Sequence, residues 1–294
     1  MDAAPIREPA AARDAAPLRD AAGRDAFRPV ERVEGALSRG ALVICDHAGN
    51  ALPPGYGTLG LPPEALDRHI AYDIGAARMA RRLAARLGAP AVLSTFSRLL
   101  IDPNRGADDP TLVMRISDRA IVPGNARIGA DEIENRRRLY WAPYRDAIET
   151  MVAAMLATGE PPAILSIHSF TPIWRGAPRR WKVAVLWDRD PRLARPLMQA
   201  LAAEDDLDAT EIGDNEPYAG GMPGDTVNAV ATARGLANAL VEVRQDLIAD
   251  PQSAEAWGDR LARIFAPLIA PIEARRPQNW GSRAADAGRL RRGA

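Results

Sequence analysis

The histidines are the residues whose positions point most directly to chemistry. The chain has 294 residues and only three histidines, and two of them, His47 and His168, stand at the ends of apolar runs typical of buried strands. Ligands of open α/β sheets bind beyond the carboxyl ends of strands, so both imidazoles are expected at one sheet edge. Because imidazole is a preferred zinc ligand, the pattern predicts one Zn²⁺ per chain. The alternative is that each histidine only satisfies a buried hydrogen bond.

A catalytic zinc site needs a third protein ligand beside the two histidines and keeps a position for water. His69 and Asp73 are four residues apart in the segment 64–87, whose apolar spacing predicts a helix, so both can share one helix face. Asn50 follows His47 by three residues and is a neutral, poorer donor. The third ligand stays open among these residues.

Glu242 is an acidic residue within the otherwise apolar run 237–244. Burying an unpaired carboxylate is costly, so this side chain needs a partner or a function. Beside a zinc site it could serve as a general base towards water and then as an acid towards a leaving amine. The alternative is an ion pair with Arg244, which lies two residues further along the same strand face.

Asn104 and Arg105 follow the apolar run 98–102 and begin a long polar loop. A guanidinium binds a carboxylate through two parallel hydrogen bonds, so Arg105 is a candidate for holding a substrate carboxylate. Arg98 is a candidate for the same role or for polarising a carbonyl. The chain has 38 basic residues, so a surface arginine is the alternative for each of them.

Strands and helices alternate along the chain, which predicts a sheet covered on both faces. We expect a three-layer α/β/α domain over 36–275 with a mixed, mostly parallel sheet. A flexible tail rich in Ala, Arg and Asp is expected over 1–35, and a loose polar tail over 276–294. The expected strands are 41–46, 91–96, 98–102, a strand from about 163, 182–187 and 237–244, and the expected helices are 64–87, 131–157, 191–203 and 251–271.

Composition excludes several classes of function. Basic and acidic residues balance at 38 each, so no global positive field attracts nucleic acid or anionic lipid. The apolar runs are too short for a membrane span, and no secretory signal is visible. One cysteine excludes an intrachain disulfide and a cysteine-based zinc cluster. A cytoplasmic protein that acts on a small molecule is expected.

Six segments in order resemble the N-formylglutamate amidohydrolase (N-formylglutamate deformylase) family and together cover about residues 40–270. They are CDHAGNALP at 45–53, DRHIAYDIGA at 67–76, SRLLIDPNR at 97–105, SIHSF at 166–170, PYAGG at 217–221 and VEVRQDLI at 241–248. The resemblance implies a phosphorylase/hydrolase-like fold shared with zinc carboxypeptidases and aspartoacylases. It also implies metal-assisted hydrolysis of an N-acyl amino acid.

By the same resemblance, His47 and His168 map onto zinc-binding histidines, Glu242 onto the catalytic glutamate, and Asn104 with Arg105 onto the pair that holds the substrate carboxylate. The carboxypeptidase pattern H-x-x-E is not kept, because Asn50 occupies its fourth position. This departure makes Asp73 the preferred third ligand.

Two hypotheses follow. The first is a zinc amidohydrolase that releases the N-acyl group of an amino acid such as N-formyl-L-glutamate, with Glu242 as base and Arg98 holding the developing oxyanion. The second is a metal-free binding protein that uses Arg105 to hold amino-acid-like carboxylates. The metal content of the purified protein separates the two hypotheses.

Overall fold

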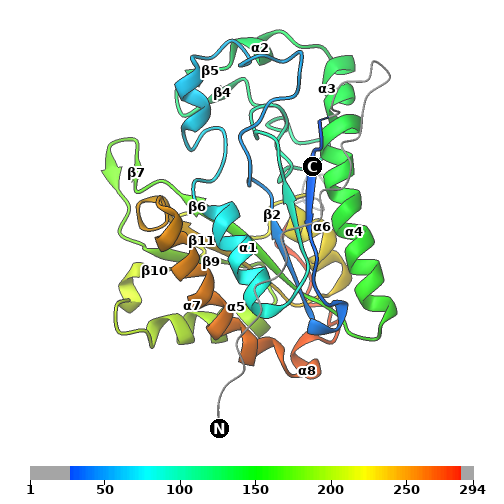
Figure 1. Ribbon diagram of the computed structural model, residues 1–294, viewed down its shortest axis with the longest axis vertical. Helices are drawn as coiled ribbons and strands as arrows, with labels where there is room; N and C mark the ends of the chain where they lie inside the picture. The colour runs from blue at the N-terminus through cyan, green and yellow to red at the C-terminus, as the bar shows by residue number, and fades with distance from the viewer. Residues whose placement is uncertain (1–26, 286–294) are drawn as a thin grey trace.

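The protein is described by a computed structural model that covers residues 27–285 (Figure 1). Seven strands form the main sheet, in the order β1-β3-β2-β6-β11-β9-β10. Their bounds are β1 Val30–Val33, β2 Ala41–Cys45, β3 Ala91–Ser94, β6 Ala163–Phe170, β9 Val183–Leu186, β10 Ile212–Asp214 and β11 Asn238–Arg244.

The four central strands β3, β2, β6 and β11 run parallel to one another. Strand β1 is antiparallel to β3, and β9 is antiparallel to β11 while β10 runs parallel to β9. All residues of β2, β3, β6 and β9 are buried, as expected for strands covered on both faces. The mixed, mostly parallel sheet of the sequence prediction is confirmed.

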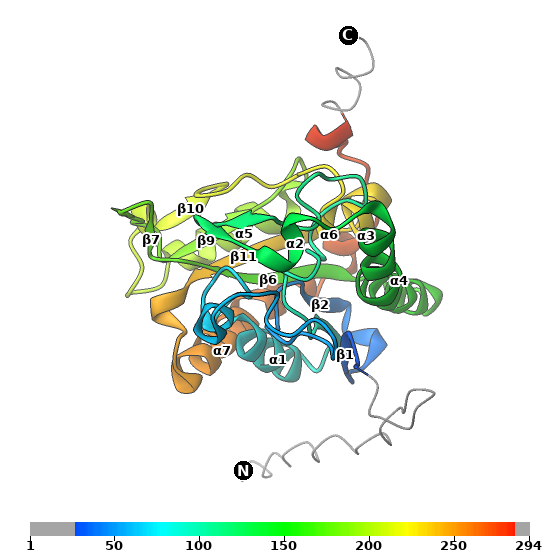
Figure 2. The ribbon, with the colours of Figure 1, turned by 90° about the horizontal axis from the view of Figure 1, so that it is seen from above.

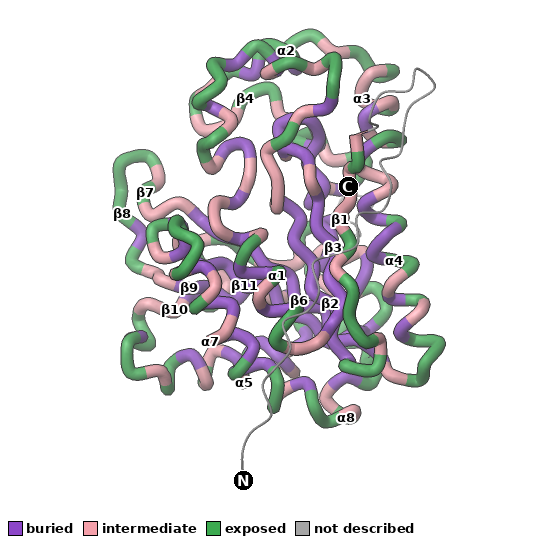
Figure 3. Tube along the Cα trace, in the orientation of Figure 1, coloured by how far each residue is buried: buried purple, intermediate pink, exposed green. Residues whose placement is uncertain are grey.

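Helices cover both faces of this sheet (Figure 2). Buried side chains of α1, α5 and α7 pack on one face, and those of α4 and α6 pack on the other. The tube in Figure 3 shows the buried strands at the centre of the described chain. The helix bounds are α1 Ala76–Leu87, α2 Pro123–Ala126, α3 Ala130–Arg136, α4 Ala142–Ala157, α5 Pro191–Ala202, α6 Thr226–Val230, α7 Pro251–Ile269 and α8 Ile272–Arg275.

Two small hairpins lie outside the main sheet. Strands β4 (Ile116–Ser117) and β5 (Ala120–Ile121) form one, and β7 (Ile173–Trp174) and β8 (Ala177–Pro178) form the other. In Figure 1 both lie on the side to which the carboxyl end of β6 points. The hairpins therefore border the same sheet edge at which ligands were expected.

The strand predicted over 98–102 is absent, and this prediction is wrong. The segment forms a turn in which the Leu100 N–H donates to the Ser97 carbonyl at 2.9 Å, and the Leu99 N–H donates to Ser97 Oγ at 3.2 Å. Leu99, Leu100 and Ile101 are nevertheless fully buried. An apolar run of this length marks burial, and here side-chain packing buries it without strand pairing.

The helix predicted over 64–87 is also only partly correct. A 3-10 turn covers Pro63–Asp67, and the α-helix α1 begins only at Ala76. Gly75 adopts a positive φ of 80°, and a Cβ there would lie 2.2 Å from the Ile248 carbonyl oxygen. The helix therefore cannot continue upstream through this position, and Asp73 lies in irregular chain instead of on a helix face shared with His69.

The first strand lies within the segment expected to be a tail. Residues 30–33 form β1, which pairs with β3, so the folded chain begins before residue 36. At the other end, the Gln278 N–H donates to the Gly235 carbonyl and Asn228 Nδ2 donates to Ser282 Oγ, so contacts also continue past 275. The rest of the predicted tails, 1–26 and 286–294, lies outside the described residues. Within 27–285, no helix has the length and apolar character to cross a membrane.

Candidate metal centre

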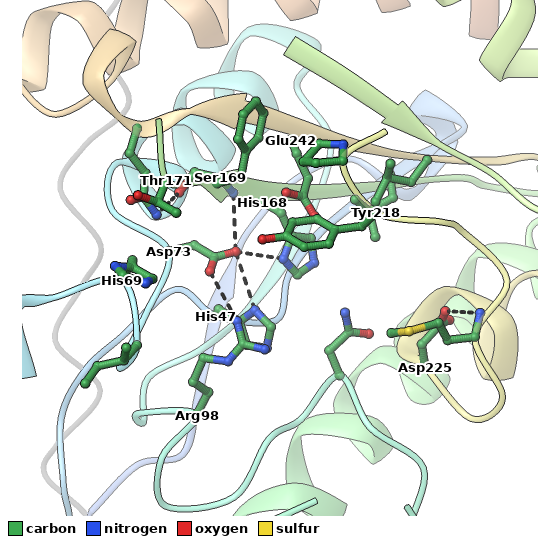
Figure 4. A pocket seen from close by; sticks show the side chains of 18 of the residues that line it. His47, His69, Asp73, Arg98, His168, Ser169, Thr171, Tyr218, Asp225 and Glu242 are labelled. Atoms are coloured by element: carbon green, nitrogen blue, oxygen red, sulfur yellow. Dashed lines mark hydrogen bonds and ion pairs between the residues drawn. The ribbon is translucent and has the colours of Figure 1, made fainter. Parts of the chain in front are cut away.

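Three predicted ligands come together at the carboxyl ends of β2 and β6. His47, Asp73 and His168 each offer one ligand atom, and these atoms lie within 4.8 Å of one another. Asp73 Oδ2 lies 2.8 Å from His168 Nδ1 and 3.4 Å from His47 Nδ1. Figure 4 shows the Asp73 carboxylate between the two rings. All three residues are buried, so this group could hold a metal ion.

Strand ends and one backbone hydrogen bond place these residues. His47 follows β2 by two residues, and His168 lies in β6, the neighbouring parallel strand. The Asp73 N–H donates to the His47 carbonyl at 2.9 Å, which ties the irregular segment before α1 to the end of β2. Asp73 therefore reaches the site through this contact and not through helix spacing.

Two further carboxylates orient the imidazole rings. His47 Nε2–H donates to Asp102 Oδ1 at 2.7 Å, and His168 Nε2–H donates to Asp46 Oδ2 at 3.0 Å. An ionised carboxylate only accepts hydrogen bonds, so both histidines carry a proton on Nε2. Their Nδ1 atoms therefore face Asp73, in the carboxylate–histidine arrangement that orients zinc ligands in other proteins.

Charge complementarity sets the protonation of this group. Burial favours the neutral carboxyl of Asp73, but the two imidazoles outweigh it and hold its pKa well below the usual range. Burial also opposes protonation of His168, but its hydrogen bonds with Asp46 and Asp73 raise its pKa to about 10. Without a metal, the ring of His168 is therefore the cation that neutralises these carboxylates.

The donor set fits a divalent metal. His47 Nδ1 is buried, makes no hydrogen bond with any described residue and lies 3.4 Å from Asp73 Oδ2, so it faces the centre of the group. Two imidazole nitrogens and a carboxylate oxygen are the protein ligands of many catalytic zinc sites. A bound cation would replace the Nδ1 proton of His168 and would be held by Nδ1 of both rings.

Glu242 lies on β11 directly opposite His168 of β6. Its Oε2 is buried and has no hydrogen-bond partner among the described residues. Burial raises the pKa of Glu242 to about 7. Arg244 instead donates to Asp246 at 2.8 Å, so the alternative of a Glu242–Arg244 ion pair is wrong. An unpaired carboxyl group of this pKa can exchange protons near neutral pH.

Arg98 lies against the metal group, and Figure 4 shows it on the side away from Glu242. Its Nη2 donates to Asp102 Oδ2 at 2.8 Å, and its Nη1 lies 3.7 Å from Asp73 Oδ1. Its Nε–H is buried and has no partner among the described residues. One donor of this guanidinium is therefore available to a bound molecule.

Asn104 and Arg105 both line the same pocket. Asn104 Oδ1 accepts from the Thr226 N–H at 3.0 Å, which leaves its Nδ2–H₂ to donate. Arg105 donates to the Asn104 carbonyl and to Thr111 Oγ1, and no described carboxylate lies within ion-pair distance of it. Its charge is therefore not neutralised by a direct partner.

The other two candidates for the third ligand lie elsewhere. His69 Nε2 lies 3.5 Å from Asp118 Oδ2, and Figure 4 shows its ring apart from the Asp73 group. Asn50 Nδ2 donates to the Leu66 carbonyl at 2.9 Å and does not line the pocket. Of the three candidates, only Asp73 joins the group with His47 and His168.

The metal group opens into a cavity of about 570 Å³. Three residues of the site were not found from the sequence: Asp46 and Asp102, which accept from the two imidazole rings, and Tyr218, whose phenol lies near Glu242 in Figure 4. Asp46 directly precedes His47, and Asp102 lies two residues before Asn104. The rule that zinc-binding histidines hydrogen-bond to carboxylates is the signal that could have found them.

The sheet is mixed and is covered by helices, and a buried His-Asp-His group lies at its strand ends. The protein is therefore an α/β protein with a candidate metal site. The family model of N-formylglutamate amidohydrolases matches residues 40–249. The chain therefore belongs to the N-formylglutamate amidohydrolase family.

Solved structures agree with this assignment. The crystal structure of the gene product Atu2144 from Agrobacterium tumefaciens is 32% identical, covers 84% of this chain and 97% of its own, and superposes with a TM-score of 0.77. N-formylglutamate amidohydrolase from Ralstonia eutropha JMP134 is 21% identical, covers 91% of this chain and 100% of its own, with a TM-score of 0.61, which shows the common fold. A comparison with curated proteins gives no match.

Proposed function

We propose that this protein is a zinc-dependent amidohydrolase that removes the N-acyl group from an amino acid with a free carboxylate. The family name makes N-formyl-L-glutamate the first substrate to test. The observation that carries the proposal is the unpaired, buried carboxylate of Glu242 beside the His47–Asp73–His168 group. A hydrolase needs such a base next to the position of its activated water.

The ion would be held by Nδ1 of His47, Nδ1 of His168 and a carboxylate oxygen of Asp73. When bound, zinc supplies Lewis acidity that makes water a better nucleophile and polarises the amide carbonyl. Asp102 and Asp46 keep both rings in the tautomer that this binding requires. The two aspartates therefore contribute by orientation and not by touching the substrate.

Glu242 moves the proton. Its carboxylate accepts a proton from water as the water oxygen bonds to the carbonyl carbon. It then delivers this proton to the amine nitrogen as the carbon–nitrogen bond breaks. The products are a carboxylic acid and the free amino acid. A pKa of about 7 suits both halves of this exchange, because the group must gain and lose a proton at neutral pH.

Two arginines bind the substrate at its two ends. Arg98 directs its unpaired Nε–H at the carbonyl oxygen as negative charge develops on it. Arg105 holds the α-carboxylate with its planar guanidinium, and Asn104 adds an amide donor beside it. These contacts fix the amide between Glu242 and the metal group.

Replacing Glu242 with Gln tests the proposal. The substitution removes the base but no metal ligand, so we expect kcat to fall by about 100- to 10,000-fold with zinc content unchanged. Hydrolysis is followed by release of the free amino acid, and zinc by elemental analysis. The control is Glu255→Gln, which changes the same chemical group in a surface ion pair with Arg78 on α1. A Glu242→Gln protein that keeps most of its kcat would exclude Glu242 as the base.

A further inference from the structure

Part of the pocket lining is apolar. The residues that line the cavity together with Glu242 include five without charge, which we call the apolar compartment: Leu186, Pro217, Ala219, Met222 and Leu240. A formyl group is too small to need such a lining. The compartment is therefore a place for another part of the substrate.

Two neighbouring strands form its floor. Leu240 lies two residues before Glu242 on β11, so both side chains point to the same face of the sheet. Leu186 of β9 stands directly opposite Leu240 in the antiparallel register. Both leucines are buried, at 5% and 8% exposure, so this floor is fixed by the sheet.

A loop that is tied to the end of β9 forms a further wall of the pocket. Asn215 Oδ1 accepts from the Trp187 N–H at 3.1 Å and from the Gly220 N–H at 2.8 Å. A Cβ on Gly220 would lie 2.5 Å from the Trp187 nitrogen, so the loop packs as closely as glycine allows. Pro217, Ala219 and Met222 lie in this loop and line the same cavity as the two leucines.

The same loop packs against the segment that carries Arg105. A Cβ on Gly106 would lie 3.3 Å from Gly224 Cα, and Arg145 Nη2 donates to both the Pro103 and the Gly224 carbonyls. The apolar wall and the carboxylate-binding arginine thus belong to one packed unit. An amino acid carries its carboxylate and its side chain on the same carbon, so a carboxylate at Arg105 brings the side chain to this wall.

The charges around the pocket disfavour a second carboxylate. Only two arginines line the cavity in the described structure, and Arg98 is already paired with Asp102. Near the compartment stand two acidic groups, Asp225 and Glu242. The side-chain carboxylate of glutamate would face these acids without a free cation, which costs binding free energy.

We propose that the pocket selects N-acyl amino acids with an apolar side chain, such as leucine or methionine, over dicarboxylic amino acids. This inference rests on the proposed function, because it takes the substrate carboxylate to lie at Arg105. By this inference, the amino acid that this protein prefers differs from the glutamate in the family name.

Three substrates of similar size test the selection: N-formyl-L-leucine, N-formyl-L-glutamine and N-formyl-L-glutamate. We expect kcat/KM of the zinc-loaded enzyme to be at least about tenfold higher for the leucine derivative than for the glutamate derivative. The glutamine derivative should fall between them, because it is polar but uncharged. Equal or higher kcat/KM for the glutamate derivative would overturn the inference and leave the proposed function standing.

Met222 offers a matched pair of variants. Its side chain is 40% exposed, so its replacement does not open the core. Met222→Arg adds a cation to the compartment and should shift the leucine-to-glutamate ratio towards glutamate by at least about tenfold. Met222→Gln adds a polar group of similar length without charge and should leave the glutamate derivative disfavoured. An unchanged ratio in Met222→Arg would contradict the inference.

Binding separates this inference from catalysis. N-methylsulfonyl-L-leucine and N-methylsulfonyl-L-glutamate keep the carboxylate and side chain but have no hydrolysable amide, and calorimetry gives their Kd for the zinc-loaded protein. Tighter binding of the leucine compound by at least about tenfold, without hydrolysis of any formyl substrate, would support the apolar pocket and reject the proposed function. Binding of neither compound would overturn both.

Discussion

The two ends of the pocket are built from different kinds of structure. At the metal end, His47 and His168 are each 2% exposed and lie at or within central strands, with every ring nitrogen directed at a carboxylate. At the substrate end, Tyr218 and Met222 are 41% and 40% exposed and lie in a loop. His47, His168 and Glu242 are thus fixed by the sheet, while Arg105, Tyr218 and Met222 are carried by loops.

The residues proposed for catalysis therefore differ in their structural setting from those proposed for substrate specificity. A change at the metal end disturbs a network of buried charges, so its effects are expected on metal binding and catalysis together. A change at the substrate end alters one partly exposed contact and leaves the sheet intact. Substitutions at the two ends should therefore differ both in size and in which constant they change.

The largest effect is expected from His168→Ala. The substitution removes a proposed ligand and leaves Asp46 and Asp73 without their shared partner, so zinc affinity should fall by at least about 1,000-fold and activity with it. His69→Ala is the control, because its ring also lines the pocket but lies against Asp118. Elemental analysis after dialysis measures the metal. Full zinc retention in a folded His168→Ala protein would place the site elsewhere.

Asp102→Asn tests the outer carboxylates of the metal end. An amide can turn its oxygen towards His47 Nε2 but no longer holds the ring by charge, and it also weakens the contact with Arg98. Zinc affinity should fall by about 10- to 100-fold. Competition with a chromophoric chelator measures the affinity. Asp118→Asn, at an acid that lines the pocket but contacts neither ring of the metal group, should leave it unchanged.

Arg105→Lys tests the substrate end. Lysine keeps the charge but loses the planar fork, so kcat/KM should fall by about 50-fold while zinc affinity stays the same. Converting the substrate carboxylate to an amide should cost the wild type a similar factor and the variant much less, because both changes remove one interaction. An enzyme that hydrolyses the acid and its amide equally well would show that Arg105 has only a structural role.

The sequence predicted the strand-borne half of the site better than the loop-borne half. His168 and Glu242 lie in apolar runs of strand length, and such runs identify both the strand and its polar exception. The helical spacing of its neighbours predicts a helix at Asp73, and only the structure shows that Gly75 packs against Ile248 and ends that pattern. The apolar compartment combines two strands and a loop that are far apart in the sequence, and no local pattern contains these contacts.

A proton and a metal ion compete for the same site, so metal binding depends on pH. In the metal-free protein, His168 carries a proton that its hydrogen bonds with Asp46 and Asp73 retain up to a pKa of about 10. Because that pKa is raised above the ordinary histidine value of 6.5, protonation stabilises the metal-free fold at low pH, and this contribution is lost as the pH rises through 10.

Metal binding must expel this proton from Nδ1, so the apparent Kd for zinc should fall by about tenfold per pH unit between about pH 8 and pH 9. Asp46, Asp73 and Asp102 do not contribute there, because their pKa values lie below the usual range and they are already ionised. Glu242, with a pKa of about 7, is mostly ionised by then as well. Chelator competition at the two pH values gives the slope, and calorimetry in buffers of different ionisation enthalpy gives about one proton released.

His69→Ala should keep this slope, since its ring does not face the metal group. A zinc affinity that does not change between the two pH values would mean that the ion binds without displacing the His168 proton, and would therefore remove His168 from the ligand set.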